Sequence, residues 1–235
     1  MSLRNLFFKT RLSYKIYLYY NLYIRHKCFL KRSRYSQWGE DLVIIEFFKN
    51  KKNGIYFDIG CFHPVMYSNT CLLYKKGWRG INIDINPVSL DLFKILRPAD
   101  FNFCTTLDEN KKDFKIFYEH SFSPANTLDE TYYKKIRNKS IKDISIKMVK
   151  SKTVDEILNL AKVTNVDFLN IDVEGMDFRM LIQLIPNKIK PKLISIETHN
   201  VDGSKSQDCD KINDFLNNSS YRILKRVGPS TLFHK

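Results

Sequence analysis

The most constraining feature of the sequence is a series of short apolar runs that alternate with helix-like segments and end in acidic residues. We expect buried strands at 55–60, 80–86, 100–107, 166–173 and 193–198. Several of these runs are nearly continuous in apolar residues, which is typical of parallel strands covered by helices on both faces. The pattern therefore predicts an α/β fold with a three-layer sandwich.

Helices are predicted between the strands, at 36–50, 88–97, 154–162, 178–185 and 208–217. The helix at 154–162 has the clearest start, because Thr153 and Glu156 match a capping box. Segments 221–227 and 231–234 flank Gly228-Pro229 and are predicted to form an antiparallel hairpin. We expect one domain at 36–235 and a separate extension at 1–35.

The positive charge of the chain is concentrated in two segments. The formal net charge is +14, which first suggests a nucleic acid or an anionic membrane as partner. Residues 1–35 hold nine Lys and Arg residues and no acidic residue, and residues 131–152 hold eight with Asp143 as the one acid. The rest of the chain is slightly acidic, so the charge does not describe the whole protein.

The extension is rich in tyrosine as well as basic. Its longest uncharged run, 16–24, is far shorter than the ~20 residues of a membrane-spanning helix. Arg25, His26 and Lys27 follow where a signal peptide would have small residues, so neither a signal peptide nor a transmembrane helix is expected. Three interpretations stay open: the extension packs on the domain or is partly disordered, it lies on an anionic membrane surface, or it binds a nucleic acid.

The cysteines indicate a reducing compartment. The chain has five, an odd number, and none forms a C-x-x-C pair. A disulfide framework and a zinc ribbon are therefore not expected. The predicted location is the cytoplasm, with peripheral contact at the inner membrane face as an option.

Candidate ligand residues lie at the ends of the predicted strands, where open α/β sheets bind ligands. The first strand ends in Asp58 and Gly60, and Asp84 ends the second, 24 residues after Gly60. A carboxylate at that distance suits a ribose diol. The fourth and fifth strands end in further candidates: Asp172, Glu174, Glu197 and His199.

The glycine pattern limits the ligand. The chain has neither G-x-G-x-x-G in the first turn nor a P-loop, which argues against a dinucleotide or a phosphotransferase. A nucleoside without a pyrophosphate, such as S-adenosylmethionine, remains.

Four segments together resemble the FkbM family of methyltransferases: SQWGEDLVI (36–44), FDIGCFHPVMYSNTCLLYKKGWRGINIDINP (57–87), FLNIDVEGMD (168–177) and ISIE (194–197). The resemblance covers residues 36–235 and is loose from 108 to 165. It implies a class I, Rossmann-like fold with a mostly parallel seven-stranded sheet and an antiparallel C-terminal hairpin. It also implies S-adenosylmethionine as methyl donor and hydroxyl acceptors, often on sugars or secondary metabolites.

The resemblance also implies site residues. Asp58, Gly60 and Cys61 would line the methionine end of the cofactor, and Asp84 would hold the ribose. Asp108 would lie near the adenine, while Asp172 and Glu174 would face the reacting centre. The chain departs from the common pattern in one place, because Phe62, His63 and Pro64 stand where class I enzymes usually carry further glycines.

Methyl transfer to oxygen is helped by a general base. The candidates are Asp172, Glu174, Glu197, His63 and His199, and the two histidines are favoured because imidazole titrates near neutral pH. The acids could instead bind a divalent cation that activates the acceptor. Glu197 is equally well explained as a strand-end residue that binds backbone amides.

Two other functions compete with this interpretation. A nucleic-acid methyltransferase would explain the charge, but Asp172-Val-Glu-Gly stands where base N-methyltransferases have [DNS]-P-P-[FYW], and no Pro-Cys nucleophile motif occurs. A non-catalytic membrane-docking module with the same fold is the other. The preferred acceptor is a small molecule or a glycan, including a lipid-linked one.

Overall fold

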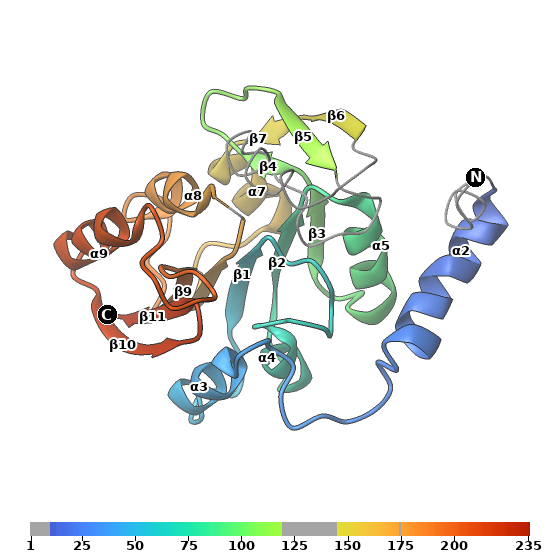
Figure 1. The fold of residues 1–235 in the computed structure, drawn as a ribbon, viewed down its shortest axis with the longest axis horizontal. Helices are drawn as coiled ribbons and strands as arrows, with labels where there is room; N and C mark the ends of the chain where they lie inside the picture. The colour runs from blue at the N-terminus through green and yellow to red at the C-terminus, as the bar shows by residue number, and fades with distance from the viewer. Residues whose placement is uncertain (1–9, 119–144, 174) are drawn as a thin grey trace.

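The computed structural model describes residues 10–118, 145–173 and 175–235. Its centre is a seven-stranded sheet (Figure 1). From one edge to the other, the strands are β10 (Arg222–Val227), β11 (Ser230–His234), β9 (Leu193–Glu197), β8 (Phe168–Ile171), β1 (Ile55–Ile59), β2 (Arg79–Asp84) and β3 (Phe101–Cys104).

The strands are parallel except for β11, which runs antiparallel to both of its neighbours, β9 and β10. This confirms the predicted fold class: a mostly parallel seven-stranded sheet with an antiparallel C-terminal hairpin. In the centre of the sheet Asp58 lies opposite Asn82 on one side and opposite Asn170 on the other.

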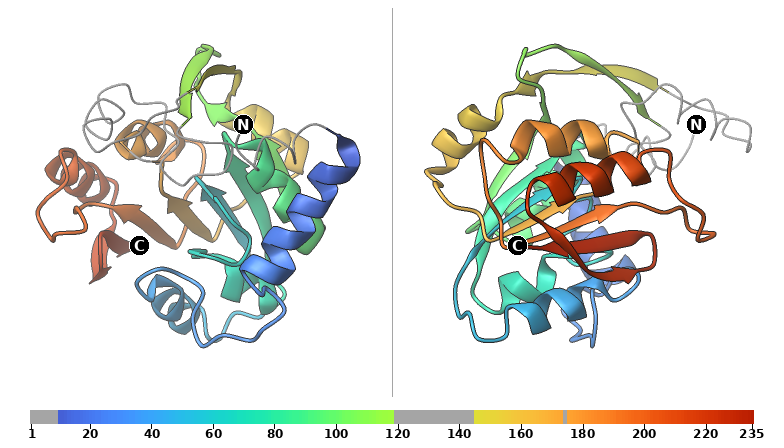
Figure 2. Two further views of the ribbon diagram at one scale, coloured as in Figure 1. Left: turned by 45° about the vertical axis from the view of Figure 1, so that its right-hand side comes forward. Right: turned by 90° about the vertical axis from the view of Figure 1, so that its left-hand side faces the viewer.

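Helices cover both faces of the sheet. Helices α7 (Val154–Ala161), α8 (Asp177–Leu184) and α9 (Cys209–Asn218) pack on the face that carries Phe57. Figure 2 shows α8 and α9 in front of the sheet in its right-hand view. Tyr56 points to the opposite face from Phe57, because successive side chains of a strand alternate. Helices α3 (Glu40–Phe47) and α4 (Cys71–Lys75) pack on that face.

The helix starts follow local chemistry. At α7 the hydroxyl of Thr153 accepts from the backbone N–H of Glu156 at 3.1 Å, and the Glu156 carboxylate accepts from that of Thr153 at 2.9 Å, which confirms the capping box. Helix α5 (Pro87–Leu96) begins after Asn86, whose side chain accepts from the backbone N–H of Val88. Its first residue is a proline, which fits the first turn of a helix because no N–H is needed there.

The predicted strand at 100–107 divides into two. After β3 the chain leaves the sheet, and β4 (Thr106–Leu107) pairs with β7 (Ser151–Lys152). The last bond of the β2–β3 ladder runs from the backbone N–H of Thr105 to the carbonyl of Asp84, and the pairing with β7 begins at the next residue. Strands β5 (Phe114–Tyr118) and β6 (Ser145–Val149) form a separate antiparallel pair. Residues 119–144, with most of the basic segment 131–152, lie outside the described residues.

The described part of the extension packs on the domain. Helix α2 (Arg11–Tyr19) continues as the π-helix η1 (Tyr20–Arg25) and lies beside α5 (Figures 1 and 2). Its buried side chains form a cluster with residues of α5 and the turn after β1: Tyr17, Leu18, Leu22, Val65, Val88 and Leu92. The Tyr14 hydroxyl also donates to Asp91 at 2.8 Å.

Two further expectations concern disulfide bonds and membrane-spanning helices. All five cysteines are free thiols. Within the described residues, no helix combines the length and the apolar character needed to cross a bilayer.

Candidate functional site

The turn after β1 closes onto the ends of its two neighbouring strands. The backbone N–H of Gly60 donates to the carbonyl of Ile83 at 2.9 Å, and Gly60 has a φ of +82°. A Cβ at this position would lie 1.7 Å from the carbonyl oxygen of Asp172. Only glycine fits there. Its left-handed backbone conformation disfavours a side chain, and the backbone at the end of β8 already occupies the position of a Cβ.

Asp84 ends β2 with its carboxylate held by two backbone groups. Oδ2 accepts from the N–H of Phe62 at 2.8 Å, and Oδ1 accepts from the N–H of Asn86 at 2.7 Å. Burial raises the pKa of Asp84 to about 6, although these hydrogen bonds act in the opposite direction. The side chain is only partly buried. A third backbone hydrogen bond, from Ile85, also lowers the pKa of Asp84, and a carboxylate has about four acceptor sites, so it can still accept from a hydroxyl donor.

Asp58 has a different environment from Asp84. It is 2% exposed, and its two oxygens accept from the Thr70 hydroxyl at 2.7 Å and from the Asn170 amide at 2.9 Å. Burial raises the pKa of Asp58, while the bonds from Thr70 and Asn170 lower it. Asp58 is thus buried beneath the turn after β1 and supports it through these hydrogen bonds. Its predicted contact with the methionine end of the cofactor stays a prediction.

A buried arginine completes this support. Arg97 is 1% exposed and donates to the hydroxyls of Thr70 and Ser68, each at 2.8 Å, and to the carbonyl of Pro64. Thr70 in turn donates to Asp58, so the chain of bonds runs from α5 to β1. The segment between Gly60 and α4 is thereby fixed to the sheet by charged hydrogen bonds.

Cys61 and His63 are also buried in the turn. Cys61 is 4% exposed, and burial raises the pKa of its thiol far above the ordinary value. His63 is fully buried, and its Nδ1 accepts from the backbone N–H groups of Val65 at 3.1 Å and Met66 at 3.0 Å. Burial, followed by the neighbouring His26, lowers the pKa of His63 well below its usual range. This placement gives His63 a structural role and weighs against a base that meets substrate.

Asp172 directly follows β8 and Glu197 is the last residue of the adjacent strand β9, and both are partly buried. The backbone N–H of Asp172 donates to the carbonyl of Ile59 at 2.9 Å, which fixes the end of β8 beside the turn. Glu174 lies outside the described residues. In the part of the chain that the structure describes, no group of three or more His, Cys, Asp or Glu side chains is placed to hold a metal ion.

His199 follows β9 and is partly exposed. Its Nδ1 lies 2.8 Å from the Thr198 hydroxyl, which lies 2.6 Å from the hydroxyl of Thr231 on β11. Burial, then the charges of Arg226 and Lys205, lower the pKa of His199. The imidazole is therefore neutral at pH 7 and can accept a proton.

Asp108 lies after β4, outside the seven-stranded sheet. Its side chain is 3% exposed, and it accepts from Arg179 at 2.5 Å and from the backbone N–H of Asn110 at 2.9 Å. Burial raises its pKa, but these bonds outweigh that effect and lower it overall. Asp108 is thus held by α8 and its own turn, and its predicted contact with adenine stays a prediction.

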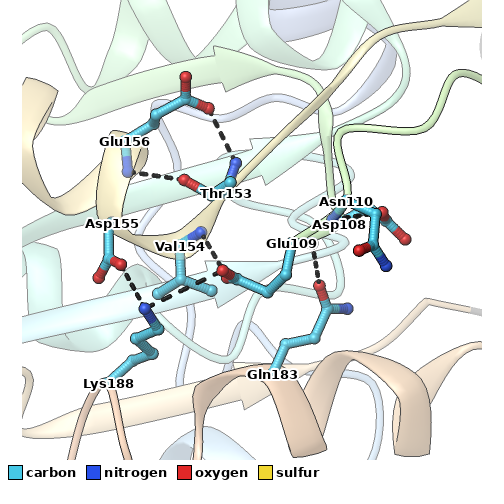
Figure 3. A network of polar contacts seen from close by, with 9 residues as sticks. All are labelled: Asp108, Glu109, Asn110, Thr153, Val154, Asp155, Glu156, Gln183 and Lys188. Carbon is cyan, nitrogen blue, oxygen red and sulfur yellow. Dashed lines mark hydrogen bonds and ion pairs between the residues drawn. The ribbon is translucent and has the colours of Figure 1, made fainter.

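The residues around Asp108 join that turn to two helices (Figure 3). Glu109 accepts from the backbone N–H of Val154 at the start of α7, where the helix dipole favours a negative charge. Its own backbone N–H donates to Gln183 of α8 at 3.1 Å. Lys188 pairs with Asp155 and lies 4.0 Å from Glu109. These contacts hold the turn after β4 against the start of α7 and against α8.

Sequence reasoning missed several of the polar residues that hold the site: Thr70, Arg97, Asn170 and Thr198. No motif marks Arg97, because a basic residue at the end of a helix is ordinary. Thr198 carried a weak signal, since a hydroxyl directly precedes the candidate base His199. Asn170 lies in the middle of a buried strand, where a polar side chain indicates a buried hydrogen bond.

Comparison with known proteins identifies the region that contains these residues. A family model described as "Methyltransferase FkbM domain" matches residues 58–223. The match begins at Asp58 and extends past His199, so it spans the turn after β1 and the ends of β2, β8 and β9. The comparison with curated proteins found no match.

Proposed function

The chain belongs to the FkbM methyltransferase family, and we propose that it uses S-adenosylmethionine to methylate a hydroxyl oxygen on a sugar, a glycan or a related metabolite. The observation that carries the proposal is the Asp84 carboxylate at the end of β2, held by the backbone N–H groups of Phe62 and Asn86. S-adenosylmethionine, when bound, supplies a methyl group on a positively charged sulfur.

Asp84 suits the ribose of a nucleoside. Its carboxylate is oriented before any ligand arrives, because two backbone donors hold it, and the ligand need not order it. With a pKa of about 6 it is mostly ionised at pH 7 and can accept from a ribose hydroxyl. The acidic strand ends Asp172 and Glu197 add negative charge at the same edge, which favours a cationic ligand.

His199 is the base that the structure supports best. It is partly exposed, whereas His63 is fully buried. When the Nδ1–H of His199 donates to the Thr198 hydroxyl, Nε2 is left to accept the proton of the acceptor hydroxyl. The hydroxyl of Thr231 lies behind Thr198 and positions it.

The order of the strands separates the two functions in space. Strands β2 and β9 are three positions apart, with β1 and β8 between them, which corresponds to about 14 Å across the sheet. The nucleoside would thus lie at Asp84 and the acceptor near His199. Asp172 and Glu197 lie on the strands nearest His199, where they can bind further hydroxyls of a sugar.

The cofactor part of the proposal is tested by calorimetric titration of the full chain with S-adenosylmethionine. Asp84→Asn removes the charge and is expected to weaken binding about 10- to 100-fold, the usual cost of a lost hydrogen bond to a charged group. Asp214→Asn, an exposed acid on α9, is the matched control and should bind normally. Normal binding by Asp84→Asn would remove the role proposed for Asp84.

The acceptor part needs a separate measurement. Glycans and small metabolites from cells that contain the active protein are compared by mass with those from cells that contain the His199→Gln variant. The expected result is a species heavier by the mass of one methylene group with the active protein only. Methylated nucleic acid as the sole product would overturn the proposed acceptor class.

A further inference from the structure

The side of α2 and η1 that faces away from the domain is apolar. Four of its side chains are highly exposed: Leu12 is 70% exposed, Ile16 52%, Tyr19 53% and Tyr20 48%. Tyr23, one turn further, stacks on Tyr19 with ring centroids 5.9 Å apart and an angle of 14° between the rings. These five side chains share one face, because they are spaced three or four residues apart. We call this surface the outer face.

The opposite side of the same helix is already used. Tyr17, Leu18 and Leu22 are buried against α5 and the turn after β1. A helix at the surface of a soluble domain normally turns charged or polar residues outward. Here both sides are apolar, and a contiguous exposed apolar patch of this kind marks a binding surface.

Further exposed apolar side chains lie at the end of η1 and just after it, and exposed basic residues flank them in the sequence. Ile24, Phe29 and Leu30 are 64%, 65% and 47% exposed. The same segment carries exposed basic residues, which follow or precede the apolar ones along the chain: Arg11, Lys15, Arg25, Lys27 and Lys31. The segment 1–35 contains no acidic residue that would neutralise them.

We propose that the outer face docks the enzyme on an anionic lipid bilayer. The leucine, isoleucine and tyrosine side chains would enter the boundary between headgroups and acyl chains, where amphipathic helices and tyrosines accumulate. The lysines and arginines of the same segment would bind the negatively charged headgroups. Charge complementarity therefore favours an anionic bilayer as the partner. The apolar side chains match its acyl chains, and the basic side chains match its negatively charged headgroups.

Two other occupants fit less well. A nucleic acid would need the basic residues at the centre of the surface, because its phosphates carry most of the affinity. Here uncharged leucine, isoleucine and tyrosine side chains occupy the centre. A second copy of the chain would bring two sets of basic side chains together, and like charges at an interface are unfavourable.

Flotation of the full chain with vesicles tests the proposal. Vesicles of phosphatidylcholine with phosphatidylserine should carry the protein to the top of a gradient, and vesicles of phosphatidylcholine alone should carry far less. Raising the salt concentration to 1 M should release much of the bound protein, because screening then acts over about 3 Å. Equal binding to the two vesicles, or none to either, would overturn the proposal.

The apolar contribution is tested with one triple variant and a matched control. The variant is Leu12→Ser/Ile16→Ser/Ile24→Ser, and it should bind vesicles at least tenfold more weakly. The control is Leu160→Ser/Ile182→Ser/Ile223→Ser, which replaces three exposed aliphatic side chains of α7, α8 and β10 and should bind normally. Since all six side chains are exposed, both proteins should fold, and the single variant Ile16→Ser provides a milder second test.

The charge contribution has its own pair of variants. Each cation near an anionic surface contributes about fivefold to binding, so Lys15→Gln/Arg25→Gln/Lys31→Gln should lose at least tenfold. Lys52→Gln/Lys190→Gln/Lys225→Gln changes the net charge equally at other exposed sites and should bind normally. Equal losses of vesicle binding in the two variants would mean that only the total charge of the protein matters, and would overturn the proposed docking face.

Two further measurements decide between the bilayer and the other occupants. Light scattering without lipid should give the same molar mass for wild type and the Leu12/Ile16/Ile24 variant. A dimer that is present in wild type and lost in the variant would assign the outer face to a second copy of the chain. RNA binding should not depend on the outer face. If the outer-face variants lost RNA binding while vesicle binding persisted, a nucleic acid would replace the bilayer as the occupant.

Discussion

The backbone N–H of Phe62 donates a hydrogen bond to the Asp84 carboxylate at 2.8 Å, so the turn after β1 and the end of β2 hold each other in place. Phe62 has a φ of +45°, a left-handed conformation that glycine adopts more easily than phenylalanine. Phe62 stands where class I methyltransferases usually have a further glycine. The turn therefore keeps a glycine-like backbone at this position, and the contact with Asp84 needs only the backbone of residue 62.

The raised pKa of Asp84 predicts a specific dependence of stability on pH. The folded protein binds this proton more tightly than the unfolded chain between pH 3.8 and about 6. The free energy of unfolding therefore contains a contribution that is present below pH 4 and is lost as the pH rises to about 6. At about 1.4 kcal/mol per pKa unit, this contribution is at most about 3 kcal/mol.

Urea unfolding between pH 4 and 7 isolates this contribution when wild type is compared with Asp84→Asn, which does not titrate. The stability of wild type relative to the variant should fall across this range. A difference that stays constant, or that rises with pH, would show that Asp84 has an ordinary or depressed pKa in the folded protein.

Gly60→Ala should be one of the most destabilising small substitutions in the chain. The new Cβ would lie 1.7 Å from the carbonyl oxygen of Asp172, so β1 and β8 would have to separate. We expect a loss of more than about 3 kcal/mol in urea unfolding, because strain at a special φ adds to a backbone clash. Gly39→Ala is the control: it has a φ of +102° with nothing within 4 Å, so only the left-handed backbone cost of about 1–2 kcal/mol applies. Similar losses in the two variants would mean that the clash at Gly60 is relieved without cost.

Thr70→Val tests the buried network beneath the site. The substitution keeps the shape of the side chain but removes the hydroxyl that donates to Asp58 and accepts from Arg97. Two buried charged groups each lose a partner, and about 2–4 kcal/mol of stability should be lost in thermal or urea unfolding. Thr164→Val, outside any helix or strand, is a control of the same chemistry and should be nearly neutral. Equal stability of the Thr70 variant and wild type would contradict a supporting role for the network.

The pKa of His199 can be followed by NMR titration of its ring nitrogens. It should titrate below the usual range for histidine, because burial and the charges of Arg226 and Lys205 disfavour the protonated ring. Arg226→Gln removes one of these charges and should raise the pKa of His199. An unchanged His199 titration in the Arg226 variant would exclude that charge as a cause.

Much of the fold was predictable because it depends on local patterns. The apolar runs at 55–60, 80–86 and 193–198 correspond to β1, β2 and β9, and the capping box at Thr153 starts α7. The third predicted strand was only partly right, because its second half pairs with β7 instead of continuing in the sheet. Pairing with a strand more than 40 residues away leaves no signal in a short stretch of sequence.

By itself, the sequence determined which residues lie at the carboxyl ends of the strands, since apolar periodicity locates a strand and the residue after it. Asp84 and His199 were found in this way. Only the tertiary structure decided which of these residues are fully buried and which are partly exposed. Asp58 and Asp84 both belong to strands with nearly identical patterns, yet Asp58 is enclosed by Thr70 and by Asn170, which is 112 residues away in the chain. Burial and hydrogen bonding depend on such distant neighbours, and they distinguish the fully buried Asp58 and His63 from the partly exposed Asp84 and His199.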